Sequence, residues 1–253
     1  MSVSPDDLPI TFGFQSVSPE EKTRRVGSVF RSVAQRYDIM NDLMSVGIHR
    51  FWKKLAIEYL SLREGQQVLD LAGGTGDLSR LASRKVGDNG LVVVGDINWH
   101  MMHVGRDRCL NSGENRGIRW SQLNAEQLPF ADNTFDRMII GFGFRNVTHK
   151  EQAISEMYRI LKPGGLALIL EFSMPKSTLL KKMYTPYLFH VLPWLGEHVV
   201  GDRDSYQYLA ESIRMHPSPE KVRDLMLERG FISCQIIALH QGLVTLHRAL
   251  KSP

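Results

Sequence analysis

The sequence predicts an α/β fold, a doubly wound and mostly parallel sheet with helices between its strands. Three observations support this prediction. Residues 67–71 are an apolar run that ends in a glycine-rich turn, which is typical of a buried parallel strand leading into a helix. Residues 91–96 are a second apolar run, ended by Asp96. Strand-like and helix-like segments then alternate up to residue 172, as expected of parallel strands joined by helical crossovers.

The N-terminal part, residues 20–60, is predicted to be a helical cap. Its apolar residues recur at three- and four-residue spacing and so share one helical face: Val26, Val29, Phe30, Val33 and Tyr37. Asn41 and Ser45 interrupt this pattern. We expect a second helix to follow them and to reach Tyr59.

The next part, residues 67–172, is predicted to be the cofactor-binding core. We expect strands at 67–71, 91–96, 118–123, 135–142 and 166–172, and helices at 77–86, 98–110 and 150–161. The Pro-Gly-Gly sequence at 163–165 predicts a turn before the last of these strands. Near the end of the chain, 219–229 is a predicted helix closed by Gly230, and 231–240 and 243–250 form a predicted hairpin.

Residues 173–216 are too long for a simple connection and are rich in aromatic side chains. Long ordered connections of this kind are often lids, and this one leaves the sheet at the carboxyl edge where open α/β sheets bind ligands. We therefore predict one domain over residues 1–253. It consists of the cap, the core, a substrate lid at 173–216 and a C-terminal helix and hairpin at 217–253.

The turn after the first core strand carries the residues that indicate a ligand. Gly74-Thr75-Gly76 allows close approach of the backbone, and Asp96, with Ile97 beside it, lies 20 residues beyond Gly76. That distance suits a carboxylate that accepts two ribose hydroxyls. Asp70 lies at the mouth of the turn, where it would repel a pyrophosphate but attract the ammonium and sulfonium of S-adenosylmethionine. The sequence therefore favours S-adenosylmethionine over a nicotinamide dinucleotide.

Composition narrows the class of protein. The chain has 253 residues, 43% of them hydrophobic, enough for one sizeable core. It shows no apolar run near the ~20 residues that span a bilayer and no signal or transit pattern, so we expect a bacterial cytoplasmic protein rather than a mitochondrial one. Cys109 and Cys234 provide neither a disulfide framework nor a metal site. The net charge of +4 is mild and suits nucleic acid, an anionic membrane surface or no particular partner.

Polar residues follow the third and fourth core strands. Asn124 and Ala125 are placed to contact the adenine edge of the cofactor. Arg145 and Asn146 come beside the methyl group by topology, and as donors they could hold an oxygen anion or a hydroquinone hydroxyl. Capping of the following helix is their alternative role. No Asn/Asp-Pro-Pro-aromatic motif occurs here, which argues against an exocyclic amine of nucleic acid as the target.

Seven stretches of the sequence also match a known pattern, in order, between about residues 11 and 250. They are residues 37–52, 70–78, 124–130, 144–148, 161–165 with 171–173, 189–193 and 204–214. The first, Tyr-Asp-Ile-Met-Asn-Asp-Leu-Met-Ser-Val-Gly-Ile-His-Arg-Phe-Trp, and the last are the most specific. Together these stretches resemble the ubiquinone/menaquinone biosynthesis C-methyltransferases.

The resemblance implies a Rossmann-like methyltransferase fold, with a seven-stranded sheet that ends in a reversed strand. It implies S-adenosylmethionine as cofactor, S-adenosylhomocysteine as product, and contacts at Thr75, Asp96, Asn124 and Ala125. One position departs from the family, which has a serine where this chain has Gly141. Any cofactor contact at Gly141 must therefore come from its backbone.

The resemblance also implies the reaction, methylation of a ring carbon of a polyprenyl benzoquinol and, in many bacteria, of demethylmenaquinol. A ring carbon becomes nucleophilic when a ring hydroxyl loses its proton, so the site needs a base or a stabiliser of the phenolate. We expect Arg145 and Asn146 to hold the ring oxygens, with Tyr37 as a third catalytic candidate. The candidates for the substrate pocket are Asp38, His49, His190 and Tyr206. Tyr37, Asp38, His49 and His190 are all candidates for the base, and the sequence does not choose between them.

The expected partners follow from this substrate. They are a polyprenyl quinol, a membrane surface, other quinone-biosynthesis proteins and a second copy of the chain, but no nucleic acid. Three alternatives stay open at this point. The chain could methylate another lipid-like acceptor such as a sterol or phosphatidylethanolamine, it could methylate nucleic acid, or it could be a non-catalytic scaffold of a quinone-biosynthesis assembly.

Overall fold

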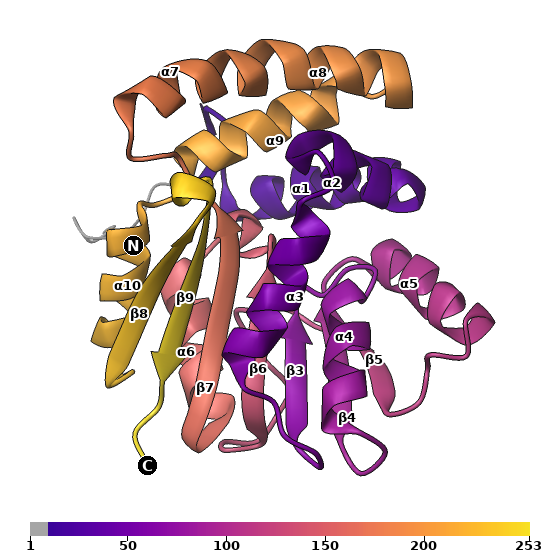
Figure 1. The fold of residues 1–253 in the computed structure, drawn as a ribbon, viewed down its shortest axis with the longest axis vertical. Coiled ribbons are helices and arrows are strands. Elements are labelled where there is room, and N and C mark those ends of the chain that lie inside the picture. Colours follow the sequence, from indigo (N-terminus) through magenta and orange to yellow (C-terminus); the bar gives the residue numbers. More distant parts are fainter. Residues whose placement is uncertain (1–9) are drawn as a thin grey trace.

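Seven strands form one sheet in the order β5-β4-β3-β6-β7-β9-β8 (Figure 1). The structure is a computed structural model that describes residues 10–253, apart from the side chains of Tyr37 and Asp38. The strands are β3 Gln67–Leu71, β4 Leu91–Asp96, β5 Ile118–Gln122, β6 Phe135–Gly141, β7 Leu161–Phe172, β8 Ser233–Leu239 and β9 Val244–Leu250. The first five are parallel, and β9 runs antiparallel to both β7 and β8. The predicted doubly wound, mostly parallel seven-stranded sheet is confirmed.

Helices cover both faces of this sheet because successive strand residues point to opposite sides. Val68 packs with α3 (His49–Leu60) and α4 (Asp77–Val86). Its neighbour Leu69 packs with α6 (Lys150–Ile160) and α10 (Pro219–Glu228) on the other face. Val94 packs on Cys109 of α5 (Trp99–Asn111). The central strands β3, β6 and β7 are thus mostly buried on both sides, which is usual for parallel sheets.

The N-terminal cap consists of α1 (Pro19–Val33), a 3-10 turn (η1, Ala34–Arg36) and α2 (Tyr37–Ser45), followed by α3. Ser18 caps α1 by accepting the Glu21 backbone N–H at 3.2 Å, and Pro19 stands in the first turn, where no N–H is needed. The predicted interruption at Asn41 is wrong, since α2 continues through it. The chain turns at Val46 instead, which adopts the left-handed conformation with φ 51°.

The predicted lid region forms helices. They are α7 (Thr178–Pro186), a π-helical segment η3 (Tyr187–Val191), α8 (Leu192–Leu195), a second π segment η4 (Gly196–Val200) and α9 (Arg203–Met215). Figure 1 shows α7 and α8 as the outermost layer, above α9, at the end of the sheet where β3 ends. Among the described residues, no helix combines the length and the apolar character needed to cross a membrane.

Three local features differ from the sequence-based expectation. The Pro-Gly-Gly sequence at 163–165 lies within β7, where a register shift against β6 absorbs it. The connection between β8 and β9 takes four residues, 240–243, of which His240–Gly242 form a 3-10 turn (η5), and not two. A short hairpin, β1 (Thr11–Phe12) and β2 (Gln15–Ser16), precedes α1, and its Phe12 ring stacks on Tyr208 of α9 at 4.1 Å between centroids.

Candidate functional site

The turn between β3 and α4 is built so that its backbone faces a ligand. A Cβ atom on Gly73 would lie 2.8 Å from the Val94 side chain, and one on Gly76 would lie 2.6 Å from Trp120. Gly74 and Gly76 adopt positive φ, 54° and 76°, which other residues rarely do. The Gly74 N–H donates to the Asp96 carboxylate at 2.9 Å, which fixes the turn against the end of β4.

Asp96 lies in the wall of a cavity at the carboxyl end of the sheet. One carboxylate oxygen accepts the Gly74 N–H, and the other accepts the Asn98 N–H at 2.7 Å. Burial raises the pKa of Asp96 to about 6, and these backbone N–H groups hold it from rising further. The carboxylate is therefore mostly ionised at neutral pH and is oriented before any ligand arrives.

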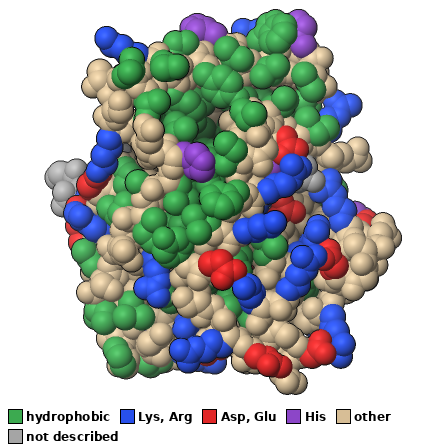
Figure 2. All heavy atoms as spheres, viewed as in Figure 1, with side chains coloured by type: hydrophobic (Ala, Val, Ile, Leu, Met, Phe, Trp, Pro, Cys, Tyr) green, Lys and Arg blue, Asp and Glu red, His purple; other side chains and the backbone are tan. Residues whose placement is uncertain are grey.

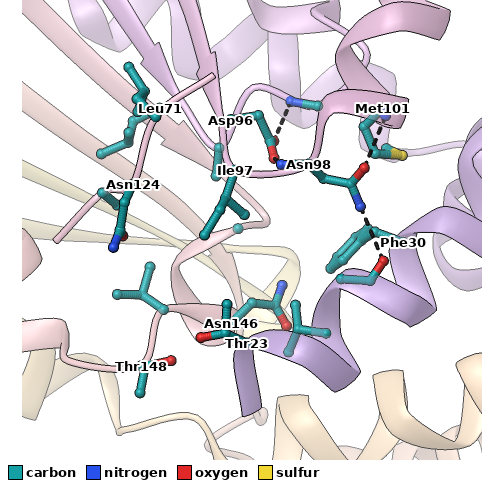
Figure 3. Close-up of a pocket in the computed structure, with 18 of the residues that line it drawn as sticks. Thr23, Phe30, Leu71, Asp96, Ile97, Asn98, Met101, Asn124, Asn146 and Thr148 are labelled. Atoms are coloured by element: carbon teal, nitrogen blue, oxygen red, sulfur yellow. Dashed lines mark hydrogen bonds between the residues drawn. The ribbon is translucent and has the colours of Figure 1, made fainter. Parts of the chain in front are cut away.

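The cavity holds about 910 Å³ of empty space, part of it open to solvent, which falls within the range of small-molecule sites. Its lining comes from α1, the β3 turn, the β4 end, the first turn of α5, the β5 end and the β6 end: Thr23, Val26, Gly27, Phe30, Leu71, Ala72, Gly74, Asp96, Ile97, Asn98, Met101, Leu123, Asn124, Ala125, Glu126, Phe142, Gly143, Asn146, Val147 and Thr148. In Figure 3, Asn146 and Thr148 lie across the cavity from Asp96 and Asn98.

Most predicted cofactor residues meet in this cavity. Gly74, Asp96 and Ile97 line one part of it, and Asn124 and Ala125 line another. Thr75 and Gly76 lie in the turn behind Gly74. The backbone cradle at Gly74, the oriented carboxylate of Asp96 and the half-exposed apolar side chain of Ile97 fit a charged nucleoside such as S-adenosylmethionine. Their role in binding the cofactor stays a prediction.

Asp70 lies one layer behind the cavity rather than in its wall. Its side chain is fully buried, Ser79 Oγ donates to it at 2.6 Å, and its other carboxylate oxygen has no partner among the described residues. Burial raises the pKa of Asp70 to about 7. Its charge would act on a cofactor through the glycine turn, not by direct contact.

Gly141 does not line the cavity. It ends β6, and a Cβ atom at this position would overlap the Leu78 side chain of α4. The next two residues, Phe142 and Gly143, line the cavity instead. Phe142 adopts a left-handed backbone with φ 58°, which is unusual for a large residue and is a mark of functional sites.

Arg145 and Asn146 are adjacent in sequence but occupy different environments. The Arg145 guanidinium is buried and donates to the Glu171 carboxylate at 2.8 Å and to the Phe142 carbonyl. Arg145 lines a second, smaller cavity of about 420 Å³ with Lys22, Lys150 and Tyr208, not the cavity that holds Asp96. The expected contact of Arg145 with substrate oxygens is therefore not prepared in this structure.

Asn146, in contrast, lines the larger cavity. Its Oδ1 accepts the Tyr208 hydroxyl at 2.8 Å, and its buried Nδ2 has no partner among the described residues. Burial raises the pKa of Tyr208, so this hydroxyl keeps its proton and donates it. Tyr208 uses one lone pair of Oδ1 and fixes the direction of the amide, and the N–H groups of Nδ2 remain for a ligand.

The remaining candidates are not brought together. His49 is buried and its Nε2 lies 2.9 Å from Asp42 Oδ1, beside a basic cleft between α3 and α4. His190 is exposed on η3. Tyr206 is fully buried, and its ring occupies the space where Gly196 has no side chain. The calls on Tyr37 and Asp38 fall on side chains outside the described ones.

Sequence reasoning missed the part of the cavity wall that α1 provides. Thr23, Val26, Gly27 and Phe30 lie at helical spacing, so the face assigned to core packing also covers the cavity. Two contacts hold α1 there. Lys22 Nζ donates to the Val147 carbonyl at 3.2 Å, and Asn98 Nδ2 donates to the Gly27 carbonyl at 3.3 Å.

Comparison with solved structures agrees with this architecture. An S-adenosylmethionine-dependent methyltransferase from Aquifex aeolicus aligns with a TM-score of 0.64 at 16% identity, over 87% of this chain and 97% of the other. One from Thermotoga maritima aligns with a TM-score of 0.61 at 19% identity, over 89% and 99%. At such identities the likeness shows the fold alone.

Sequence relatives are much closer. Proteins named ubiquinone/menaquinone biosynthesis C-methyltransferase UbiE are 52% identical in Methylococcus capsulatus and 54% in Legionella pneumophila. Both align over 95% of this chain, and over 97% and 96% of their own length. The model of the ubiE/COQ5 methyltransferase family matches residues 18–251. The predictions of family, of an S-adenosylmethionine-dependent methyltransferase and of its cofactor are thus confirmed, and the chain belongs to the ubiE/COQ5 methyltransferase family.

Proposed function

We propose that the chain transfers a methyl group from S-adenosylmethionine to a ring carbon of a polyprenyl benzoquinol, and of demethylmenaquinol. The names of the relatives supply the reaction class. The structural observation that carries the proposal is the Asn146 amide in the wall opposite Asp96, which Tyr208 directs and whose Nδ2 has no partner in the part of the chain that the structure describes. A buried N–H without a partner costs about 1–3 kcal/mol, so a site that keeps one is suited to a ligand oxygen.

On the cofactor side, the residues bind and orient. S-adenosylmethionine, when bound, supplies an electrophilic methyl group. Asp96 would accept the ribose hydroxyls, the Gly74 backbone would face the amino-acid portion, and Asn124 and Ala125 would contact the adenine edge. Ile97, which is 47% exposed, would cover the base with apolar surface. Asp70 adds negative charge behind the turn and favours a cationic ligand.

On the acceptor side, the chain must favour the anionic form of a ring hydroxyl, because only then is the neighbouring ring carbon a good nucleophile. Asn146 Nδ2 would donate to that oxygen and stabilise the charge that develops on it. The candidates for the proton acceptor stay Tyr37, Asp38, His49 and His190. Arg145 takes a supporting role, since its ion pair with Glu171 ties the Phe142–Asn146 segment to β7.

A polyprenyl acceptor resides in lipid, so we further propose that the chain works at a membrane surface, peripherally and on the cytoplasmic side. A homodimer and contacts with other quinone-biosynthesis proteins stay predictions. So does the division of the chain into cap, core, lid and C-terminal hairpin.

The test is methyl transfer from labelled S-adenosylmethionine to short-tail demethyl benzoquinol and naphthoquinol. Chemically reduced acceptors are compared with the oxidised quinones. Product from the reduced forms alone supports quinol C-methylation. Cofactor binding without product from any of the four acceptors contradicts it and favours another lipid acceptor or a scaffold.

A further inference from the structure

Exposed large hydrophobic side chains are concentrated in one region of the molecule. Sixteen occur among the described residues, and nine of them fall within 39–51 and 179–199, about one-seventh of the described chain. We call these nine the outer face: Ile39, Val46, Ile48, Phe51, Leu179, Met183, Val191, Trp194 and Val199. Val46 is 81% exposed and Leu179 is 69% exposed, so they are not edge residues of the core.

The two segments are neighbours in space. The Tyr187 hydroxyl of η3 donates to the Leu43 carbonyl of α2 at 2.6 Å, and α2 packs against α8. In Figure 2, hydrophobic side chains run from α7 and α8 at the top down to the start of α3. Charged side chains gather lower, over α4 and α5. The two segments of the outer face therefore lie side by side at the carboxyl end of the sheet.

The charges beside the outer face are mainly positive. Lys54, Lys181 and Lys182 are exposed on α3 and α7. The acids of the two segments are engaged. Asp42 forms an ion pair with Arg50 at 2.8 Å, and Glu197 forms one with Arg203 at 2.7 Å. We infer that the outer face docks on an anionic lipid surface. Its apolar side chains would enter the interface, Trp194 would lie at headgroup level, and the lysines would meet lipid phosphates.

A second copy of the chain is a weaker fit to the same surface. In a two-fold dimer the same patch of both copies forms the interface, so Lys181 and Lys182 of both copies would lie in or beside it, while Asp42 and Glu197 are already paired within each chain. Like charges brought together in this way oppose association. A lipid surface instead supplies the opposite charge and fluid apolar volume.

The inference rests on the proposed function, and it assigns a role to the lid at 173–216. The outer face and the cavity lie at the same end of the sheet, so docking would hold the cavity close to the membrane. A lipid-resident acceptor would then reach it without the tail crossing water. By docking on the membrane, the lid would thus bring the cavity to the lipid in which the acceptor resides.

The experiment is sedimentation of the full chain with vesicles of phosphatidylcholine alone or with one-third phosphatidylglycerol. We expect binding to the anionic vesicles and at least tenfold weaker binding of the triple variant Leu179→Ser, Met183→Ser, Val199→Ser. The matched control Leu110→Ser, Leu227→Ser, Ile232→Ser also removes three exposed hydrophobics, 54%, 40% and 57% exposed, and should bind within twofold of the parent chain. Lys181→Glu with Lys182→Glu should abolish the preference for anionic vesicles.

Three results would overturn the inference. They are no binding of the parent chain to anionic vesicles, equal loss in the two triple variants, or a parent dimer that the first triple variant alone converts to monomer in analytical ultracentrifugation. Methyl transfer to short-tail quinol in solution reports on the proposed function separately. If the parent chain binds vesicles but fails to methylate short-tail quinol, the function fails and the docking surface stands.

Discussion

At the scale of single residues, orientation of polar groups decides what the cavity can bind. Asp96 is held by two backbone N–H groups, and the Asn146 amide is held by one tyrosine hydroxyl. Both side chains are positioned before a ligand arrives, which is the condition for strong electrostatic stabilisation. Tyr208 is therefore as much a part of the proposed site as Asn146, although it lines the smaller cavity.

The coupling between Tyr208 and Asn146 can be measured. Tyr208→Phe keeps the ring that stacks on Phe12 and removes only the hydroxyl, so the amide loses its fixed direction. We expect kcat to fall about tenfold or more with S-adenosylmethionine affinity within twofold, because one positioned hydrogen bond is worth about 1–2 kcal/mol.

Asn146→Ala should lower kcat further, and adding Tyr208→Phe to it should change nothing more. Independent, multiplicative losses in this double-mutant cycle would show that the hydroxyl acts on something other than Asn146.

Asp70 should make cofactor binding depend on pH. Its pKa is about 7 in the free protein, raised by burial, so the group carries a proton in much of the population below that pH. A cationic ligand favours the ionised form. Affinity for S-adenosylmethionine should therefore rise as pH increases from 5.5 to 7, by up to tenfold per unit at full coupling.

Asp70→Asn should bind more weakly and with a shallower pH dependence, measured by calorimetry. The remaining slope in that variant belongs to Asp96, whose pKa is about 6. Identical slopes in the parent and in Asp70→Asn would refute the role of Asp70.

At the scale of elements, the junction of β6 and β7 depends on a buried ion pair. Glu171 is fully buried and Arg145 nearly so, and no solvent screens them. Removing one partner leaves a charge in the interior, which typically costs 3–5 kcal/mol.

We expect Arg145→Ala to lose about that much stability in urea unfolding. Arg145→Met with Glu171→Leu should be less destabilised than either single substitution, because no unpaired charge remains. A double variant as unstable as the sum of the singles would contradict the ion-pair explanation.

At Gly27 in α1, the residue that favours ligand binding is not the residue that favours helix stability. Glycine inside a helix costs about 0.5–1 kcal/mol relative to alanine. A Cβ atom there would meet nothing within 4 Å, because Gly27 faces the cavity. Gly27→Ala should raise stability by about that amount and weaken cofactor binding, seen by thermal unfolding and calorimetry.

Gly105 in α5 is the matched control. A Cβ atom there would lie 2.5 Å from the Thr75 carbonyl oxygen, so Gly105→Ala should lower stability. If both variants gained stability, or both lost it, the space around each glycine would not be what determines the effect of the substitution.

At the scale of the whole molecule, the cap and the core form one binding unit. The cavity takes its walls from α1 and from four strand ends, and Lys22 and Asn98 tie α1 to the 145–148 and 96–101 segments. A ligand that contacts all of these should stabilise them together. We expect S-adenosylhomocysteine to slow amide hydrogen exchange in α1 and in 143–148 as well as in the β3 turn. Protection confined to 70–76 and 96–98 would separate the cap from cofactor binding.

Local patterns predicted the core well because each element there obeys its own rule. Apolar runs closed by glycine or Asp96 located β3, α4 and β4 at the residues where the structure has them. The contribution of α1 to the cavity wall was not predicted, because the same apolar face of α1 packs on the core and lines the cavity. The environments of Arg145 and Tyr208 depend on Glu171 and Asn146, which lie 26 and 62 residues away. Spacing along the chain cannot reveal such long-range pairs.

The strand order has a consequence for synthesis of the chain. Strand β9 lies between β7 and β8, although it follows both in sequence. While the ribosome is still adding residues 244–250, β8 has no place to pair and the apolar edge of β7 stays open. An open apolar edge can pair with another nascent chain. We therefore expect the sheet to close only after β9 has been synthesised, and to depend on chaperones until then.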